Sequence, residues 1–162
     1  MEFLSIAKQR FSVRSYTSQH VEPEKLEKIL EAARVAPTAA NLQPIRLIVA
    51  QSEQSLAKIG KAANIYGAPL AIIVCADHEK AWVRPFDKKQ TGDIDASILT
   101  DHMMLQATEL GLEAFGYAIL IRTFCAGSLN CRNILNQSIF WQLDIPMPEL
   151  LIPAALTGRE LP

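Results

Sequence analysis

The chain has 162 residues, a formal net charge of −1 and a hydrophobic fraction of 49%. This length favours one domain with a real core, and the balanced charge argues against nucleic acid or an anionic membrane as a partner. No apolar stretch is long enough to span a bilayer and no signal peptide is recognisable, while the three cysteines fit no zinc spacing. We therefore expect a cytoplasmic protein with reduced thiols and no metal site.

Residues 2–9 predict a short helix, and an extended segment with two arginines follows it. Because alternate residues of an extended chain point to the same side, Arg10, Ser12 and Arg14 would present two guanidinium groups and a hydroxyl on one face. Such a set suits a phosphate group, since arginine offers planar, bidentate donors. The alternative is a solvated edge with two surface arginines, and the spacing alone favours that alternative.

A second helix is predicted from Pro23, at its first position, to about Val35, because a proline in the next loop disfavours helix before it. The loop 36–44 is bounded by prolines and rich in small residues. Small side chains would let a flat ring approach the backbone, and Asn41 and Gln43 could each donate and accept at the edge of a heterocycle. The alternative, which is the more common case, is a connector whose amides satisfy their own turn.

Two strands with a helix between them are predicted next. The strands are Ile45–Ala50 and Leu70–Ala76, and the helix is Ser52–Ala63, capped by its first residue. The second strand is a continuous apolar run, typical of a strand buried on both faces. Cys75 within it is most simply a packed core thiol. Residues 77–92 are mostly polar and predict a surface loop.

The stretch from Asp93 to Leu112 predicts the central helix of the fold. Asp93 and Asp95 are placed to cap it and to complement its dipole, and Gly111 is expected just past its end. Apolar side chains wrap most of its circumference, a pattern typical of a helix buried on several sides. We therefore expect the rest of the chain to pack around this helix, which a partner subunit could share.

Three blocks of this sequence together resemble the FMN-dependent nitroreductase family, in the family's order and spacing over roughly residues 3–112. The blocks are Arg10-x-Ser12-x-Arg14, then Pro37-Thr38-Ala39-x-Asn41-x-Gln43-Pro44, then Asp95 through Leu112. The resemblance implies an α+β fold, a three-layer sandwich with a mostly antiparallel sheet flanked by helices. It also implies an obligate homodimer with FMN bound in the interface.

The resemblance further implies which residues bind the cofactor. Arg10, Ser12 and Arg14 would hold the FMN phosphate and ribityl chain. The loop residues Pro37, Thr38 and Ala39 would approach the isoalloxazine, and Asn41 and Gln43 would bond its polar edge. NAD(P)H would be the hydride donor, and a nitroaromatic, quinone or similar compound the acceptor. Since the flavin performs the chemistry, no residue is assigned as a catalytic acid or base.

After Leu112 the sequence departs from the family pattern. Reading the codons one base out of register permits a tryptophan at the Phe115–Gly116 junction. From Asn130 onward it permits Leu-Pro-Glu-His-x-Glu-Pro-Val-Asn-Ile-Leu-Ala-Ile-Gly-Tyr, which resembles the missing closing strand of the family. We therefore predict a frameshift near Glu113, with weakened FMN binding and a less stable dimer. Genuine divergence of residues 113–162 is the alternative, and a flavin-binding or scaffold protein without turnover is the alternative function.

Overall fold

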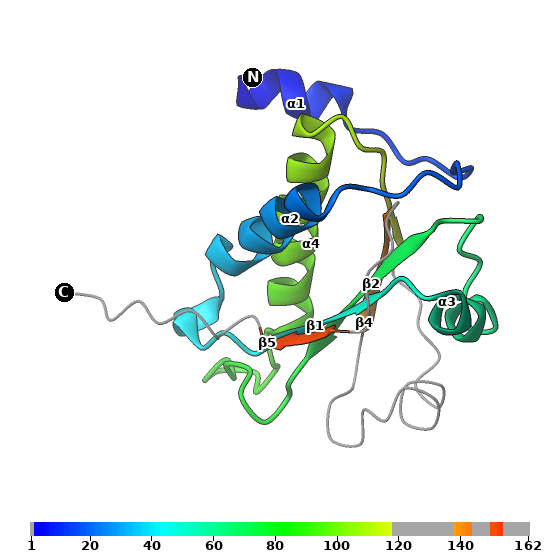
Figure 1. Cartoon of the computed structure of the whole chain (residues 1–162). Coiled ribbons are helices and arrows are strands. Elements are labelled where there is room, and N and C mark those ends of the chain that lie inside the picture. Colours follow the sequence, from blue (N-terminus) through cyan, green and yellow to red (C-terminus); the bar gives the residue numbers. More distant parts are fainter. Residues whose placement is uncertain (1, 118–137, 144–149, 154–162) are drawn as a thin grey trace.

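The computed structural model of the chain describes residues 2–117, 138–143 and 150–153. It contains a five-stranded sheet with helices on both faces, which confirms the α+β fold class (Figure 1). The helices are α1 (Phe3–Gln9), α2 (Pro23–Val35), the short 3-10 helix η1 (Ala39–Asn41), α3 (Glu53–Gly60) and α4 (Gly92–Glu109). The strands are β1 (Ile45–Ala50), β2 (Leu70–Ala76), β3 (Phe115–Tyr117), β4 (Ser138–Leu143) and β5 (Leu150–Pro153).

The sheet has the strand order β3-β4-β2-β1-β5, and each neighbouring pair is antiparallel. The β1–β2 pair runs in register from Ile45 opposite Ala76 to Ala50 opposite Ala71. Every residue of β2 is buried, which confirms the prediction of a strand covered on both faces. Cys75 is 0% exposed, as expected of a core thiol.

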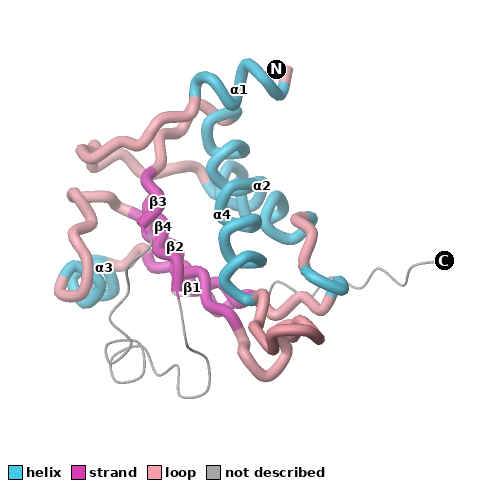
Figure 2. Tube along the Cα trace, turned by 180° about the vertical axis from the view of Figure 1, so that it is seen from behind, coloured by secondary structure: helices cyan, strands magenta, loops and turns pink. Residues whose placement is uncertain are grey.

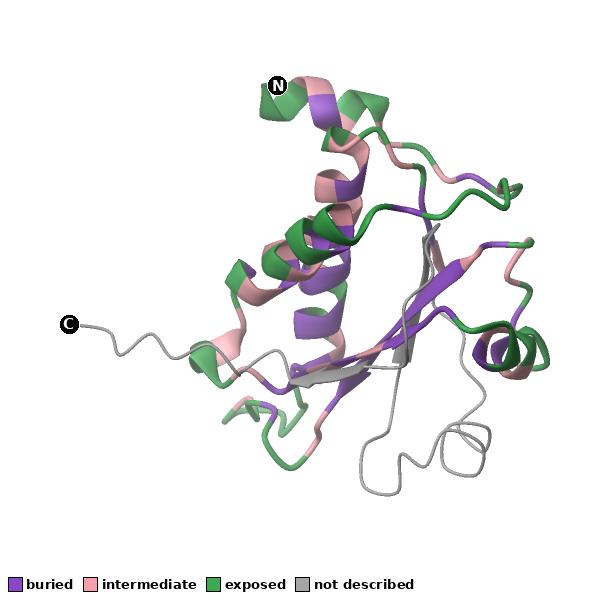
Figure 3. Ribbon diagram, in the orientation of Figure 1, coloured by how far each residue is buried: buried purple, intermediate pink, exposed green. Residues whose placement is uncertain are grey.

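Two helical layers cover opposite faces of the sheet, α2 with α4 on one and α3 on the other (Figure 2). Neighbouring residues of β2 separate accordingly, since side chains alternate along a strand. Ile72 and Val74 pack in the cluster under α2 and α4, while Ile73 packs in the cluster under α3. In Figure 3 the buried residues of α2 and α4 face each other and the sheet, and the outer side of α2 is exposed.

The central helix is present as α4, and its ends differ in how well the sequence predicted them. Gly111 has φ +74°, and the amides of Gly111 and Leu112 donate to the carbonyls of Thr108 and Ala107. These two hydrogen bonds form the Schellman motif, a common helix C-terminus. At the other end the prediction of side-chain caps is wrong. Thr91 is the N-cap residue and makes no side-chain cap bond.

The α3 helix begins as predicted, because Ser52 Oγ accepts a hydrogen bond of 3.2 Å from the amide of Ser55. It ends at Gly60 rather than at Ala63, since the chain turns after Lys61. No helix among the described residues is long and apolar enough to cross a membrane.

The segment that departs from the family pattern contributes β3, β4 and β5 to the described structure. β4 pairs with β2 from Ser138 opposite Cys75 to Leu143 opposite Leu70. Residues 118–137, 144–149 and 154–162 lie outside the described residues. The shifted reading frame places the stretch that resembles the family's closing strand from Asn130 onward, and β4 (Ser138–Leu143) falls within that stretch. The frameshift itself stays a prediction.

Candidate functional site

The arginine segment is extended, as predicted, and lies between α1 and α2. Ser12 forms a parallel bridge with Ala114, and the amide of Val13 donates to the carbonyl of Ala114 over 3.4 Å. Val13 is buried, whereas Arg10 and Ser12 are half-buried and Arg14 is exposed. The segment therefore anchors itself through Val13 and keeps its polar side chains nearer the solvent.

Arg14 is held by an aromatic contact. Its guanidinium carbon lies 4.6 Å from the centroid of the Phe115 ring, a cation–π distance. Phe115 in turn meets the edge of the Tyr66 ring, with centroids 5.6 Å apart. Among the described residues neither Arg10 nor Arg14 has an acidic partner. Both guanidinium groups can therefore offer their donors to an anion.

The predicted loop contains unusual backbone geometry. Ala40, Asn41 and Gln43 have φ angles of 50°, 53° and 50°. This left-handed region costs a residue other than glycine about 1–2 kcal/mol, although asparagine tolerates it better than most. The loop is therefore strained, and neighbouring groups must hold it in this shape.

Hydrogen bonds within the loop provide part of that hold. Thr38 Oγ1 accepts from the amide of Gln43 over 3.1 Å, and Asn41 Oδ1 accepts from Gln43 Nε2 over 2.9 Å. The connector alternative is thus partly realised, because the two carboxamides bond each other. Within the described residues Asn41 Nδ2 and Gln43 Oε1 make no hydrogen bond, so one donor and one acceptor stay available.

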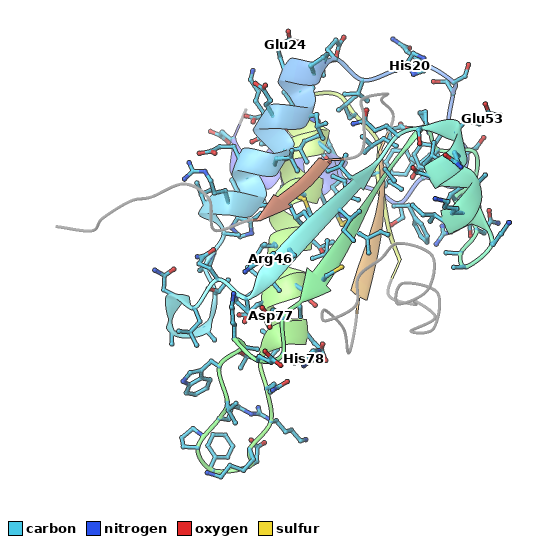
Figure 4. The ribbon with its side chains drawn as sticks, turned by 60° about the horizontal axis from the view of Figure 1, so that its bottom comes forward. His20, Glu24, Arg46, Glu53, Asp77 and His78 are labelled. Carbon is cyan, nitrogen blue, oxygen red and sulfur yellow. The ribbon has the colours of Figure 1, made fainter. Side chains whose placement is uncertain are left out.

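Residues at the start of β1 and just after β2 bond the C-terminal end of the loop. Arg46 Nη1 donates to the carbonyl of Gln43 over 3.3 Å and to that of Ile45 over 2.9 Å. The amide of Asp77 donates to the carbonyl of Pro44 over 2.8 Å. Figure 4 shows Arg46 and Asp77 at the same end of the sheet, as expected from the pairing of Ile45 with Ala76.

Asp95, which the sequence assigned to a helix cap, instead binds the loop. Its Oδ1 accepts a hydrogen bond of 2.9 Å from the amide of Ala39, and its Oδ2 accepts from Thr91 Oγ1 over 3.3 Å. The side chain is only 1% exposed. Asp95 lies in the first turn of α4, so it complements the helix dipole as predicted. The contact between Ala39 and Asp95 joins residues 56 apart in the sequence, which pattern reasoning did not foresee.

The structure does not bring the two predicted segments together within one chain. The loop bonds Asp95 in the first turn of α4, whereas Ser12 pairs with Ala114, beyond the last turn of α4. A helix of this length, 18 residues, extends about 27 Å. In Figure 1 the arginine segment after α1 and the loop after α2 lie at opposite ends of α4. Within one chain the two segments are therefore separated by the length of α4.

Two hollows lie elsewhere on the described surface. A wide groove of about 980 Å³ runs between α1, α2 and α4 and includes Phe3, Val35, His102 and Leu105. A smaller hollow of about 280 Å³ lies near the start of α2. Neither hollow includes a predicted cofactor residue. Among the described residues no cluster of histidine, cysteine and acidic side chains could hold a metal ion.

Comparison with known proteins decides the family. The model of the nitroreductase family matches residues 7–65. A solved nitroreductase family protein from Clostridium difficile 630 is 47% identical, over 94% of this chain and 87% of that chain, with a TM-score of 0.84. This chain belongs to the nitroreductase family. The resemblance predicted from three sequence blocks is thereby confirmed.

Curated relatives of this nitroreductase family member are longer than it is. A relative from Methanothermobacter thermautotrophicus is 35% identical over 118 residues, which cover 70% of this chain and 59% of the relative. An FMN reductase [NAD(P)H] from Bacillus subtilis is 30% identical over 118 residues, covering 62% of this chain and 47% of the relative. The chain thus spans roughly half to three fifths of these relatives.

Proposed function

We propose that this chain is an FMN-dependent oxidoreductase that transfers hydride from NAD(P)H to a nitroaromatic, quinone or similar acceptor. The observation that carries the proposal is that two separate segments offer different hydrogen-bonding groups. One extended segment offers cationic donors near the solvent, and a separate loop, held by hydrogen bonds, offers paired amide groups. The FMN reductase [NAD(P)H] of Bacillus subtilis supports the cofactor. So does a solved FMN-dependent nitroreductase from Clostridium difficile R20291, 28% identical with a TM-score of 0.73.

The arginine segment fits the phosphate end of FMN. Arg10 and Arg14 supply guanidinium groups with no acidic partner among the described residues, and Ser12 between them supplies a hydroxyl. Hydrogen bonds between arginine and phosphate are charge-assisted and can be bidentate. The ring of Phe115 supports the Arg14 guanidinium from one side, which limits the conformational freedom lost on binding.

The loop fits the ring end of FMN. The side chains of Pro37, Thr38 and Ala39 are small or compact, so a flat ring can approach their backbone. The two carboxamides are hydrogen-bonded to each other, and Asn41 Nδ2 and Gln43 Oε1 offer one donor and one acceptor. An imide edge presents both acceptors and a donor, so it can use both groups. When bound there, the cofactor supplies the two-electron chemistry. The chain's own residues bind and orient the ring.

We infer that a homodimer completes the site, with FMN in the interface. The two binding segments lie at opposite ends of α4, so a cofactor that touches both needs one segment from each chain. The groove between α1, α2 and α4 offers the contact surface. It includes Phe3 and Val35, which are 70% and 61% exposed. Exposed apolar patches with a polar rim are typical of association sites.

Residues 113–162 bear on how firmly the cofactor is held. If they are out of frame, their pattern was never selected to complete the pocket. We expect the 162-residue chain to purify with less than one FMN molecule per chain. Added FMN should then fill the remaining sites. A stoichiometric yellow protein whose intact mass matches this sequence would contradict that expectation. Sequencing the gene across the Glu113 codon tests the frameshift directly.

The functional test is steady-state oxidation of NAD(P)H by the FMN-loaded protein, with a nitroaromatic or a quinone as acceptor. The proposal expects acceptor-dependent oxidation and bleaching of the flavin absorbance by NAD(P)H. The second candidate, flavin binding without turnover, is favoured by the departure of residues 113–162 from the family pattern. It predicts FMN binding with no acceptor-dependent oxidation.

The dimer is tested by sedimentation of a groove variant. Val35→Asp places a charge on the proposed contact surface, and dimer affinity should fall about tenfold or more. Phe86→Asp is the matched control, because Phe86 is 79% exposed and lies outside the groove. Equal dimer affinity for Val35→Asp and the unsubstituted chain would rule out this face as the interface.

A further inference from the structure

Asp95 is the one acidic or basic side chain that is buried among the described residues. Burial of a charge is unfavourable unless hydrogen bonds compensate it. Its partners are an amide in the loop and the hydroxyl of Thr91. A carboxylate in this position therefore does more than fill space in the core.

The carboxylate joins a strained loop to a rigid helix. The body of α4 is anchored by Leu99 and Met103, which are 1% and 0% exposed. Asp95 lies on that helix, and its Oδ1 accepts from the amide of Ala39 at the start of η1. Ala40 and Asn41, the next two residues, are left-handed. The bond thus fixes the backbone at the point where the strained geometry begins.

We propose that Asp95 is a positioning residue for the cofactor, an inference that rests on the proposed function. It holds the loop Thr38–Gln43 in the conformation that presents Asn41 and Gln43 to the flavin ring. Without this acceptor, the Ala39 amide loses its partner in the part of the chain that the structure describes, and the left-handed residues can relax toward ordinary backbone angles. The paired amide groups would then no longer share one edge.

A purely structural role would look different. Thr100 is also buried on α4, at 6% exposed, but its hydroxyl donates to the carbonyl of Ala96 within the same helix. Thr100→Ala is therefore a matched control, because it removes a buried hydrogen bond from α4 without touching the loop. An effect that follows Asp95 and not Thr100 would separate loop positioning from helix stability.

The experiment compares Asp95→Ala, Asp95→Asn and Thr100→Ala with the unsubstituted chain, using two readouts. The first is amide hydrogen exchange of the loop in the protein without cofactor. The second is the FMN dissociation constant, measured by quenching of flavin fluorescence. Loss of a charge-assisted bond should speed loop exchange and weaken FMN binding by about tenfold or more in Asp95→Ala. Asp95→Asn should recover most of both, since its amide oxygen can still accept from Ala39.

A backbone variant guards against misfolding of Asp95→Ala. Ala39→Pro removes the donor instead of the acceptor. Thr38 is extended, with φ −128° and ψ 158°, the conformation that a residue before proline adopts. The same faster exchange of the loop amides is expected in the protein without cofactor, where contacts between Ala39 and the ring play no part.

The outcomes are separable. If the unsubstituted chain binds no FMN, the proposed function fails, while loop exchange still decides whether Asp95 holds the loop. Loop exchange in Asp95→Ala equal to that of the unsubstituted chain would overturn the inference. So would an equal change in Thr100→Ala, or faster loop exchange with unchanged FMN affinity.

Discussion

The arginine segment and the η1 loop are built on different principles. The arginine segment is plain extended backbone, anchored by its contact with Ala114, and its polar side chains lie near solvent. The loop contains three left-handed residues and is held by internal hydrogen bonds, by Arg46 and by the buried carboxylate of Asp95. Recognition of a phosphate needs charge on one face, whereas recognition of a ring edge needs a fixed backbone. The two ends of the cofactor should therefore respond to different substitutions.

The largest effect is expected from removal of the charges. Arg10→Ala with Arg14→Ala should weaken FMN binding about a hundredfold, because two charge-assisted contacts are lost. Riboflavin lacks the phosphate but keeps the ribityl chain, so it should lose much less affinity than FMN. Arg84→Ala, which removes an arginine paired with Asp87 outside both segments, is the control. An equal loss of riboflavin affinity in the double variant would show that the segment does not read the phosphate.

The loop should give the complementary result. Asn41→Ala with Gln43→Ala removes the two amide groups, and FMN and riboflavin should both bind about tenfold more weakly. The ratio of the two affinities should stay constant, since the phosphate contacts are untouched. Fluorescence titration with each ligand measures this ratio. If FMN lost affinity and riboflavin did not, the loop would contact the phosphate end of the cofactor and not the ring.

Strain distinguishes the segments even without ligand. Ala40→Gly should stabilise the fold by about 1 kcal/mol, because glycine adopts φ 50° without steric cost. The control, Ser15→Gly in the arginine segment, has no positive φ to relieve and should be neutral or slightly destabilising. Urea unfolding measures both. A destabilised Ala40→Gly would mean that the loop is not strained at this position.

The smallest effect is expected at the exposed pair that follows the arginine segment. A hydrogen bond from Lys25, 2.7 Å from Glu22, lowers the pKa of the Glu22 carboxyl below its ordinary value. The stabilisation by this pair is therefore present above the ordinary pKa of glutamate and is lost as the pH falls through the lowered value. Exposed pairs contribute little, so Glu22→Gln should shift thermal unfolding by less than replicate scatter. A clear shift at neutral pH would contradict this.

Sequence patterns predicted the elements well where periodicity and termination signals agree. The apolar run Leu70–Ala76 and the cap at Ser52 have local causes, and both are confirmed. The end of α4 at Gly111 is also local, because the left-handed residue after a helix favours glycine. Such features depend on neighbours within a few residues, so a linear pattern can reveal them.

The role of Asp95 could not be predicted in the same way. The sequence placed it near a helix start, where a cap is the common expectation. Because α4 starts at Gly92, Asp95 lies too far into the helix to cap it, and its partner is 56 residues away. The sequence likewise did not predict the left-handed backbone angles of Ala40 and Gln43, since neither residue type favours them. These features arise from tertiary contacts rather than from local preference.

A site shared between two chains is central to the proposed function, and mixing two defective variants tests it directly. One chain carries Arg10→Ala with Arg14→Ala, and the other carries Asn41→Ala with Gln43→Ala. Heterodimers purified through two different tags should contain one intact site, with FMN affinity equal to that of the unsubstituted chain. Heterodimers that bind FMN no better than either parent would contradict a shared site.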